Sequence, residues 1–526
     1  MGKSSERVLP VLGSALQHHL LIAAIRPETP LKAAGFLFAV RMAGVMDPNL
    51  REPWWRDRVL WLIVLLAAVL RLAFLGHKSL WLDEAATFTL STSSLHAFAR
   101  EWWSREANAT AYYMLERVWL HLGHSEWMLR LPSAVFGIIA VPAIYVFARH
   151  VFGLQAAWIA ALLLAVNPAH IEHSQDARAY TMAMCLGLIS SGLLLKAIEE
   201  GGRRVWVAYV LISALAVYAH VFAALVLVSQ AVSLVAVPRE KLRWKPLLLA
   251  AAGVMLLCGP VLIFFALQGH TVTTAWIAPA NAKQVFRLFQ FYSGSGLKFI
   301  LMAALWAAGL WKISRERQAA EGRWRVALLL SWIVVPILLA FAVSLRQSVF
   351  AFKYLMVALP PVIVLAVAGA MALPRVARWV IVAGLAMASC ATIFTGYKKP
   401  IEDWRGLSAY VQQNFQSGDA IAFSPPYARN AMDYYWDRTG IHDLKSLAPK
   451  PLVGELEADA VAEANPAALL KACEDCRRVW LVEYGTDAPP PGAKERLRAM
   501  IAAMPDGDQL RQTNVFKNVR VYLFAP

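Results

Sequence analysis

Long apolar runs between residues 59 and 396 constrain the fold more than any other feature of this chain. Each run is long enough, or nearly long enough, to cross a bilayer as a helix. The composition agrees, because 59% of the 526 residues are hydrophobic and 16% are charged, whereas soluble domains have roughly 45–50% and about 25%. The sequence therefore predicts a mainly α, polytopic membrane bundle of about 11 spans, and it excludes a disordered chain, a fibrous repeat and an ordinary cytosolic enzyme. The predicted spans are 59–75, 131–148, 153–169, 179–197, 205–219, 221–237, 246–268, 298–312, 326–345, 354–373 and 379–396.

The net charge of +16 does not indicate a nucleic-acid-binding surface, because the basic residues stand in small clusters between the apolar runs. Clusters of this kind usually report membrane topology. If 205–237 makes two passes, all the main clusters fall on one side of the membrane. Short positively charged loops mark the cytoplasm, so this reading places the N-terminus inside and the C-terminus outside. The clusters are Arg51/Arg56/Arg58, Lys196/Arg203/Arg204, Arg239/Lys241/Arg243/Lys245, Lys312/Arg315/Arg317/Arg323/Arg325 and Arg375/Arg378.

Three regions complete the predicted domain organisation. Residues 1–58 contain several prolines and no spanning run, and are interpreted as a cytoplasmic tail; Met46 is an alternative start. Residues 59–396 form the transmembrane domain, with a long first outer loop at 76–130. From 397 to 526 polar residues return, and short β-rich runs alternate with helical patterns. This segment is predicted to be an extracytoplasmic α/β domain.

Two details of the outer domain can be predicted more closely. Its β-rich runs are 420–423, 478–483 and 520–524, and its helical patterns are 403–416 and 492–503. Cys473 and Cys476 also belong to it. In an oxidising compartment they can form a local disulfide, whereas a lone pair at this spacing is weak evidence for a metal.

The first outer loop begins with an acidic pair, Asp83-Glu84, directly after an apolar turn. Carboxylates in outer loops are often solvated decoration. Here Leu80, Trp81 and Leu82 precede the pair, and a carboxylate among apolar residues at the membrane surface costs free energy unless it has a role. The pair is therefore a candidate catalytic site.

Several basic and aromatic residues are predicted on the same membrane face. Arg178 precedes a span and can be a snorkelling or capping residue paired with Asp176, or a guanidinium directed at a lipid phosphate. His220 stands in a tight outer turn, and Lys353-Tyr354 begins another span. Each alone is more often structural, but with Asp83 they converge on one face.

The loop 269–297 contains Trp276. An interfacial tryptophan is most often a membrane-belt residue. Near an acidic residue, the same ring can stack on a sugar or guide an isoprenoid tail. Both interpretations remain open at this point.

In their order along the chain, these motifs resemble those of bacterial GT-C membrane glycosyltransferases of the protein O-mannosyltransferase-like superfamily (glycosyltransferase family 39 type), which are related to lipid A aminoarabinose transferases. The resemblance covers about residues 59–440. It rests on Leu80-Trp-Leu-Asp83-Glu84-Ala85, Asn108 with Tyr112-Tyr113, Arg130-Leu-Pro-Ser133, His173-Ser-Gln-Asp176-Ala-Arg178-Ala-Tyr180, His220, Trp276-Ile, Lys353-Tyr354 ahead of Pro360, and Asp403-Trp404-Arg405.

The resemblance implies an inverting enzyme of the bacterial inner membrane that moves a sugar from a polyprenyl-phosphate donor to an acceptor hydroxyl on a lipid, glycan or protein at the periplasmic face. Asp83 would be the general base, and Glu84 would orient it. Arg178, with Lys353 and Tyr354, would bind the donor phosphate. A divalent metal held by Asp83, Glu84 and His220 is an open alternative. The substrate-binding residues would be Asn108, Tyr112, Tyr113, Asp176, Tyr180, His220 and Trp276.

Two positions depart from the family pattern. Ala109-Thr110 stand where relatives often have a Pro-Pro pair, and Lys353 stands where they commonly have arginine, so the bidentate fork is lost there. Two other hypotheses remain. One is a lipid-linked-sugar flippase, which predicts inverted repeats and ionisable residues near mid-bilayer. The other is a non-catalytic envelope assembly factor that works through its outer domain.

Overall fold

The computed structural model describes residues 53–104, 108–268, 277–315, 320–397, 399–416, 419–436, 478–487, 492–502 and 509–526. The chain divides into two units, Met1–Arg58 and Val59–Pro526, and the fold described below is that of the second unit. Nearly all of the predicted tail 1–58 lies outside the described residues. Trp276, Cys473 and Cys476 also lie outside the described residues.

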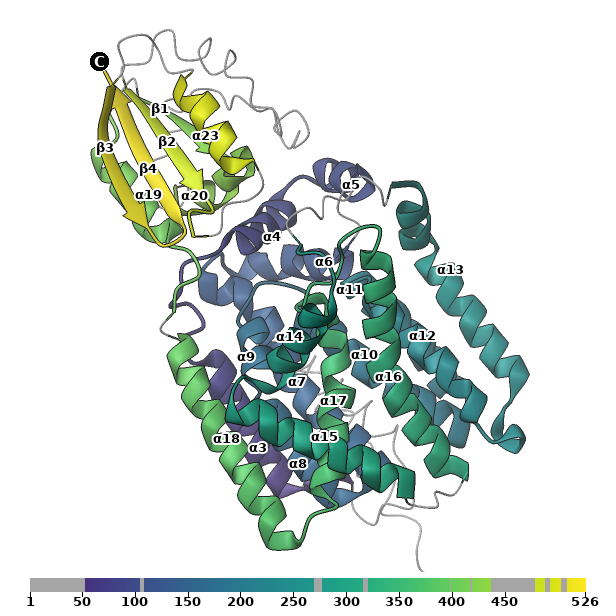
Figure 1. Cartoon of the computed structure of the whole chain (residues 1–526). Helices are drawn as coiled ribbons and strands as arrows, with labels where there is room; N and C mark the ends of the chain where they lie inside the picture. The colour runs from purple at the N-terminus through teal and green to yellow at the C-terminus, as the bar shows by residue number, and fades with distance from the viewer. Residues whose placement is uncertain are drawn as a thin grey trace, which may run out of the picture. The chain divides into compact units, whose positions relative to one another are not determined.

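A helix is present at each of the predicted spans (Figure 1). The mainly α fold class is therefore confirmed. The helices are α3 (Arg58–Leu72), α7 (Glu126–Phe152), α8 (Leu154–Ala165) with α9 (Pro168–Ser174), α10 (Tyr180–Glu199), α11 (Arg203–Ala219), α12 (Ala223–Ser233), α13 (Trp244–Gln268), α15 (Leu297–Arg315), α16 (Ala320–Ser344), α17 (Leu359–Ala370) after the 3-10 helix Tyr354–Ala358, and α18 (Arg375–Tyr397).

Within the described residues, six helices are long and apolar enough to cross a membrane, and a seventh span results if α8 and α9 are counted as one. The predicted run 153–169 does not form one straight helix: α8 ends at Ala165, and the chain bends by 58° before α9. Asn167 caps α9, since its side chain accepts a hydrogen bond from the His170 amide at 2.9 Å, and Pro168 occupies the first helical position. The number of eleven spans remains a prediction.

Charged residues mark the two ends of α10. At its C-terminal end, Glu199 accepts a hydrogen bond from Arg325 of α16 at 2.9 Å and lies 2.7 Å from His150 of α7. Its N-terminal end follows Arg178. Because a 20-residue helix is about 30 Å long, Lys196 and Arg325, which belong to two of the predicted basic clusters, lie far along α10 from Arg178.

Two glycines allow α15 and α17 to cross at close range. A Cβ added at Gly369 would lie 1.9 Å from the Leu305 carbonyl oxygen, and one added at Gly309 would lie 2.4 Å from the Leu365 carbonyl oxygen. Small residues commonly permit such backbone approach between membrane helices.

Shorter helices complete the helical part of this unit. Four of them lie in the first outer loop and in the segment that precedes α15. They are α4 (Leu82–Thr92), α5 (Leu95–Ser104), α6 (Thr110–Trp119) and α14 (Ala282–Ser293).

The C-terminal region forms the predicted α/β domain. Its four-stranded sheet has the order β1-β2-β4-β3, with β1 (Asp419–Ser424) and β2 (Arg478–Tyr484) parallel and the other pairs antiparallel. The predicted strands match β1, β2 and β4 (Val519–Ala525). The strand β3 (Gln509–Phe516) was not predicted, because it is an edge strand with mostly exposed, polar residues and lacks the apolar pattern of a buried strand.

Helices cover both faces of this sheet (Figure 1). The helix α23 (Ala493–Ala502) packs through Met500 on the face that contains Val479 and Leu481. The opposite face, with Val482 and Val519, is covered by two helices, α19 (Trp404–Asn414) and α20 (Arg429–Trp436). Of these two, α20 was not predicted.

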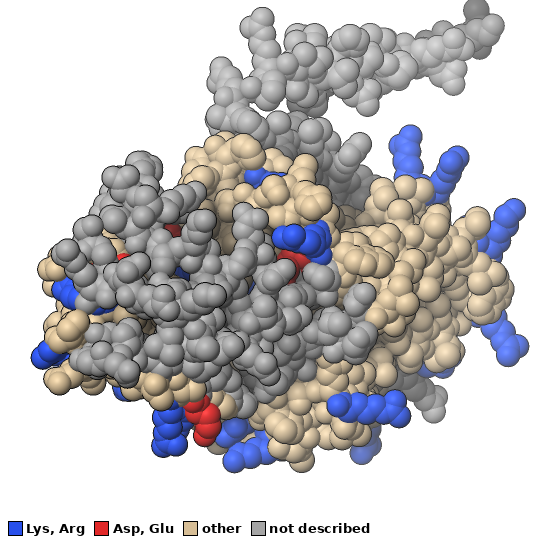
Figure 2. All heavy atoms as spheres, turned by 90° about the horizontal axis from the view of Figure 1, so that it is seen from above, with Lys and Arg blue, Asp and Glu red and all other residues tan. Residues whose placement is uncertain are grey.

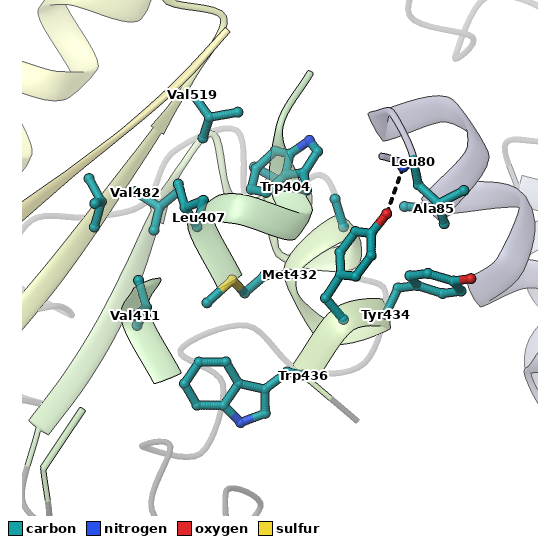
Figure 3. Close-up of a cluster of buried hydrophobic side chains, with 14 of the residues drawn as sticks. Leu80, Ala85, Trp404, Leu407, Val411, Met432, Tyr434, Trp436, Val482 and Val519 are labelled. Carbon is teal, nitrogen blue, oxygen red and sulfur yellow. Dashed lines mark hydrogen bonds between the residues drawn. The ribbon is translucent and has the colours of Figure 1, made fainter. Parts of the chain in front are cut away.

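The core under α19 and α20 is continuous with the first outer loop (Figure 3). Leu80 and Ala85 are fully buried in the same cluster as Trp404, Leu407 and Met432. The outer domain and the start of α4 therefore share one hydrophobic core.

Seen from above, the described surface is largely uncharged, and many of its lysine and arginine side chains project at the rim (Figure 2).

Candidate active site

The acidic pair lies in the first turn of α4, and its two members have different surroundings. Glu84 is fully buried and forms a two-pronged ion pair with Arg130 of α7, with Nε–Oε1 and Nη2–Oε2 distances of 2.7 and 2.6 Å. Glu84 also accepts a hydrogen bond from the Ala177 amide at 2.8 Å. Such charge-assisted, bidentate bonds are strong and directional. Glu84 therefore ties α4 to α7 and to the segment that precedes α10.

The loop that leads into α4 has little regular structure, so its backbone groups need other partners. Two arginines provide most of them. Arg130 donates to the carbonyl oxygens of residues 75, 78 and 79 at 2.9–3.0 Å. Arg405 of α19 donates to those of residues 76, 77 and 78 at 3.1–3.3 Å. Five consecutive carbonyls, from Leu75 to Ser79, are thereby held by guanidinium groups.

The three amides that follow are also held by side chains. The Leu80 amide donates to the Tyr435 hydroxyl at 2.7 Å, the bond drawn as a dashed line in Figure 3. The Trp81 amide donates to Glu84 at 3.3 Å, and the Leu82 amide donates to Glu402 Oε2 at 2.9 Å. Two of these three acceptors belong to the C-terminal region.

Asp83 points toward a lysine. Its Oδ2 lies 2.8 Å from Lys353 Nζ, with 33% of the Asp83 side chain and 17% of the Lys353 side chain exposed. Burial alone would raise the pKa of Asp83, but the positive charges of Lys353 and Arg178 outweigh burial and hold this pKa below its ordinary value. Asp83 is therefore an ionised carboxylate that solvent or a substrate can still reach.

Arg178 contacts the backbone of Asp83. Its Nη1 is 3.3 Å from the Asp83 carbonyl oxygen, from the Thr87 hydroxyl and from the Tyr113 hydroxyl. Its guanidinium carbon is 5.9 Å from the centre of the Tyr180 ring. The structure therefore brings Asp83, Arg178 and Lys353 close together.

Aromatic rings surround the Lys353 ammonium. Its Nζ lies 4.8 Å from the centre of the Trp81 ring, 5.8 Å from that of Tyr180 and 6.0 Å from that of Tyr354. Rings at this range attract a cation. Tyr180 is only 2% exposed, and its hydroxyl has no hydrogen-bond partner among the described residues. The site therefore contains a buried donor that a ligand can satisfy.

Asn108 and His220 form a second layer next to these rings. Asn108 Nδ2 lies 3.3 Å from His220 Nε2, and its Oδ1 accepts a hydrogen bond from the Val221 amide at 3.0 Å. The His220 ring packs 4.9 Å from that of Tyr354. Ala109 has a φ of 67°, which a proline ring does not permit. The backbone here thus differs from what the family's Pro-Pro pair would impose.

Tyr112 is fully buried, and its hydroxyl lies 2.7 Å from the Ser133 hydroxyl. Ser133 in turn donates to the Arg178 carbonyl oxygen at 2.8 Å. Asp176 accepts a hydrogen bond from His173 Nδ1 at 2.8 Å. Tyr112 and Asp176 therefore lie one layer behind the group formed by Asp83, Arg178 and Lys353.

A pocket of about 330 Å³ adjoins Lys353. Asp83 and Arg178 are not among the residues that line this pocket. Lys353 does line it, and its ion pair with Asp83 connects the pocket to the Asp83 carboxylate. Its wall combines phenylalanine rings with a few polar groups. Among the residues that line it are Glu172, His173, Phe291, Phe350, Phe352 and Lys353.

The described residues contain no group of three or more His, Cys, Asp or Glu side chains arranged to hold a metal ion. Asp83, Glu84 and His220 are the ligands that the sequence suggests for such an ion. Glu84 is instead engaged with Arg130, and His220 with Asn108. Trp276, the remaining predicted site residue, lies outside the described residues.

Sequence reasoning missed Glu402 and Tyr435. Tyr435 belongs to a helix that was not predicted, and no local pattern links it to a loop 355 residues earlier. Glu402 carried a weak signal, since it directly precedes the Asp403-Trp404-Arg405 motif where polar residues return.

Comparisons with known proteins agree with this architecture. Residues 110–264 match the family model described as dolichyl-phosphate-mannose-protein mannosyltransferase. The mannosyltransferase-like proteins YycA and YkcB of Bacillus subtilis (strain 168) are each 25% identical, over 157 and 156 residues. The matches cover 28% and 27% of this chain, and the chain spans only about a fifth (22%) of the length of either relative.

Among solved structures, ArnT from Cupriavidus metallidurans has a similar fold. In the apo state the TM-score is 0.55 at 14% identity, covering 88% of this chain and 97% of ArnT. For ArnT bound to undecaprenyl phosphate the TM-score is 0.59 at 13% identity, covering 89% of this chain and 98% of ArnT. The resemblance to GT-C membrane glycosyltransferases is therefore confirmed as a similarity, in a family-model match over residues 110–264 and in an ArnT-like fold. Six of the described helices are long and apolar enough to cross a membrane.

Proposed function

We propose that this protein transfers a sugar from a polyprenyl-phosphate donor to an acceptor hydroxyl, with inversion at the anomeric carbon. The observation that carries the proposal is the group formed by Asp83, Lys353 and Arg178. One reachable carboxylate is paired with Lys353, and Arg178 contacts the backbone carbonyl of the same residue, so the group combines a proton acceptor with a positively charged site for a leaving phosphate. The undecaprenyl phosphate bound to the similarly folded ArnT supports this class of donor.

In the proposed reaction, the acceptor oxygen attacks the anomeric carbon and its proton passes to the Asp83 carboxylate. The bond between the anomeric carbon and the phosphate oxygen breaks, and the electron pair leaves with the phosphate. Lys353 and Arg178 stabilise the negative charge that develops there. A single displacement of this kind inverts the anomeric centre and needs one base.

The ion pair between Asp83 and Lys353 adds a feature to this mechanism. A donor phosphate next to Lys353 competes with Asp83 for the ammonium group. When Lys353 turns toward the phosphate, its hold on Asp83 weakens and the carboxylate becomes more basic. Donor binding thereby activates the base. The Tyr180 hydroxyl, which has no partner among the described residues, is a further donor for the phosphate.

The pocket next to Lys353 suits the lipid end of such a donor, because its phenylalanine rings are apolar and Lys353 lies at its edge. Further roles follow from the same proposal: Tyr354 supports Lys353, and Asn108, Tyr112, Tyr113, Asp176 and His220 shape the surrounding wall. The basic clusters of the sequence support a site on the periplasmic side of a bacterial inner membrane.

Asp83→Asn tests the proposal. The purified protein in lipid nanodiscs is given undecaprenyl-phosphate-linked mannose, glucose or 4-amino-4-deoxyarabinose, and release of undecaprenyl phosphate is followed with membrane extract as acceptor. Wild type should consume at least one donor, and Asp83→Asn should fold and be inactive. Asp487→Asn, which removes an exposed ion pair with Lys517, is the matched control. An active Asp83→Asn protein would disprove the assignment of the base.

A further inference from the structure

The C-terminal α/β domain contacts the backbone at the point where Asp83 is displayed. Asp83 follows directly on Leu82, whose amide is held by Glu402, and Tyr435 holds the Leu80 amide two residues earlier. In sequence, these contacts join residues 320 and 355 positions apart. The outer domain therefore supplies hydrogen-bond acceptors that the loop itself cannot provide.

Glu402 is well suited to hold a helix start. It is 2% exposed, and its Oε2 accepts hydrogen bonds from the Leu82 amide at 2.9 Å and from the Trp404 indole at 2.6 Å. It forms no ion pair with any cation that the structure describes. Burial raises the pKa of Glu402 to about 7, although hydrogen bonds from the Trp404 and Tyr484 side chains and from the Leu82 amide oppose this. A carboxylate without a counter-ion is stabilised here by the amide and the positive end of α4.

The Tyr435 ring is packed in the hydrophobic core that the C-terminal domain shares with the start of α4. The ring belongs to the cluster that contains Leu80, Ala85 and Trp404. Its hydroxyl oxygen accepts a hydrogen bond from the Leu80 amide at 2.7 Å and another from the Ser79 hydroxyl at 3.3 Å.

We propose that Glu402 and Tyr435 are positioning residues for sugar transfer: they fix the N-terminus of α4, and therefore the Asp83 carboxylate, relative to Lys353 and Arg178. This inference rests on the proposed function. It assigns the outer domain a part in catalysis through Asp83, without contact between that domain and the substrate. A base that is displaced by about 1 Å can lose on the order of 100-fold in rate.

Neighbouring tyrosines provide a matched pair of variants. Tyr435→Phe removes only the hydroxyl that holds Leu80. Tyr434→Phe removes a hydroxyl of similar burial on the same helix, which donates instead to the His124 carbonyl oxygen at 2.8 Å. His124 precedes α7 and is not part of the loop that leads to Asp83.

The variants are measured in nanodiscs with the undecaprenyl-phosphate-linked sugar that wild type consumes. Tyr435→Phe should lower kcat about 10-fold with little change in KM for the donor, and Glu402→Ala should lower it about 10–100-fold. Glu402→Gln keeps an acceptor oxygen and should restore kcat to within about threefold of wild type. Tyr434→Phe should behave as wild type.

Hydrogen–deuterium exchange of peptides covering residues 79–86 gives a readout that does not depend on activity. Exchange should accelerate in Tyr435→Phe and Glu402→Ala but not in Tyr434→Phe. If Glu402→Ala does not fold, the tyrosine pair decides the question alone.

Three results would overturn the inference while the proposed function stands: unchanged kcat and exchange, a rise in KM without a fall in kcat, or equal effects of the two tyrosine variants, each with Asp83→Asn inactive. If Asp83→Asn itself transfers sugar, it is the proposed function that fails.

Discussion

Replacing Lys353 by methionine separates its electrostatic effect on Asp83 from its effect on the donor. Methionine is similar in length but has no charge. Lys353 and Arg178 hold the pKa of Asp83 below its ordinary value against the opposing effect of burial. Lys353→Met should therefore raise this pKa, and the acid limb of the pH–rate profile should move to higher pH.

The size of the change follows from the geometry. At the 2.8 Å separation of Asp83 Oδ2 and Lys353 Nζ, two unit charges attract by about 6 kcal/mol at an effective dielectric constant of about 20. That figure is an upper bound, because 33% of the Asp83 side chain is exposed. A nearby cation usually lowers a carboxyl pKa by about 1–3, and exposure favours the lower end. We therefore expect the limb to move by about one pH unit, or about 1.4 kcal/mol.

The assay is the pH dependence of kcat/KM for the donor, which reports ionisations of the free enzyme. Lys353→Arg is the matched control, since it keeps the positive charge and should leave the limb where it is in wild type. Both variants are expected to bind the donor less tightly than wild type. The limb position is read from the shape of each profile and does not depend on its height.

A second comparison uses wild type alone. If the donor phosphate takes Lys353 away from Asp83, the acid limb of kcat should lie at higher pH than that of kcat/KM. The reasoning fails if the limbs of Lys353→Met and wild type coincide, or if Lys353→Arg moves as far as Lys353→Met.

Other predictions concern stability. Arg130→Met leaves the buried carboxylate of Glu84 without its partner and should cost about 3–5 kcal/mol, seen as a large fall in Tm and in the yield of folded protein. Gly369→Ala places a methyl group against the backbone of α15, with 1.9 Å from the added Cβ to a carbonyl oxygen, whereas Gly384→Ala meets nothing within 4 Å; only the first should lower Tm. Burial would raise the pKa of Asp419, but hydrogen bonds from neighbouring side chains and an amide outweigh burial and lower this pKa. The ionised Asp419 therefore contributes to stability above about pH 4, and this contribution is lost as the pH falls further. Asp419→Asn should abolish this pH dependence in the amide exchange of β1 and β2.

The fold class could be predicted because a helix in lipid satisfies its own backbone and needs only apolar side chains outside. Every predicted span therefore corresponds to a helix. Where a local side chain interrupts that rule, the prediction was less accurate, as at Asn167 and Pro168, where the helix breaks and bends by 58°. The edge strand β3 was missed for the opposite reason, since its exposed, polar residues carry no pattern.

The candidate site was partly readable. Asp83, Arg178 and Lys353 stand beside the apolar runs, and charges at such boundaries are rare enough to be noticed. The sequence could not show which charges pair. It paired Glu84 with Asp83, as the residue that orients the base, whereas the structure directs Glu84 to Arg130 and Asp83 to Lys353, because successive residues in a helical turn point in different directions.

The helices and the C-terminal α/β domain could thus be predicted from the sequence alone, since each depends on residues close together in the chain. Only the tertiary structure decided that Lys353 reaches Asp83 and that Glu402 and Tyr435 hold the start of α4. These contacts join residues about 270 to 355 positions apart. The contacts from Glu402 and Tyr435 exist because a loop with little regular structure must find partners for its backbone groups, and folding brings those partners from the far end of the chain.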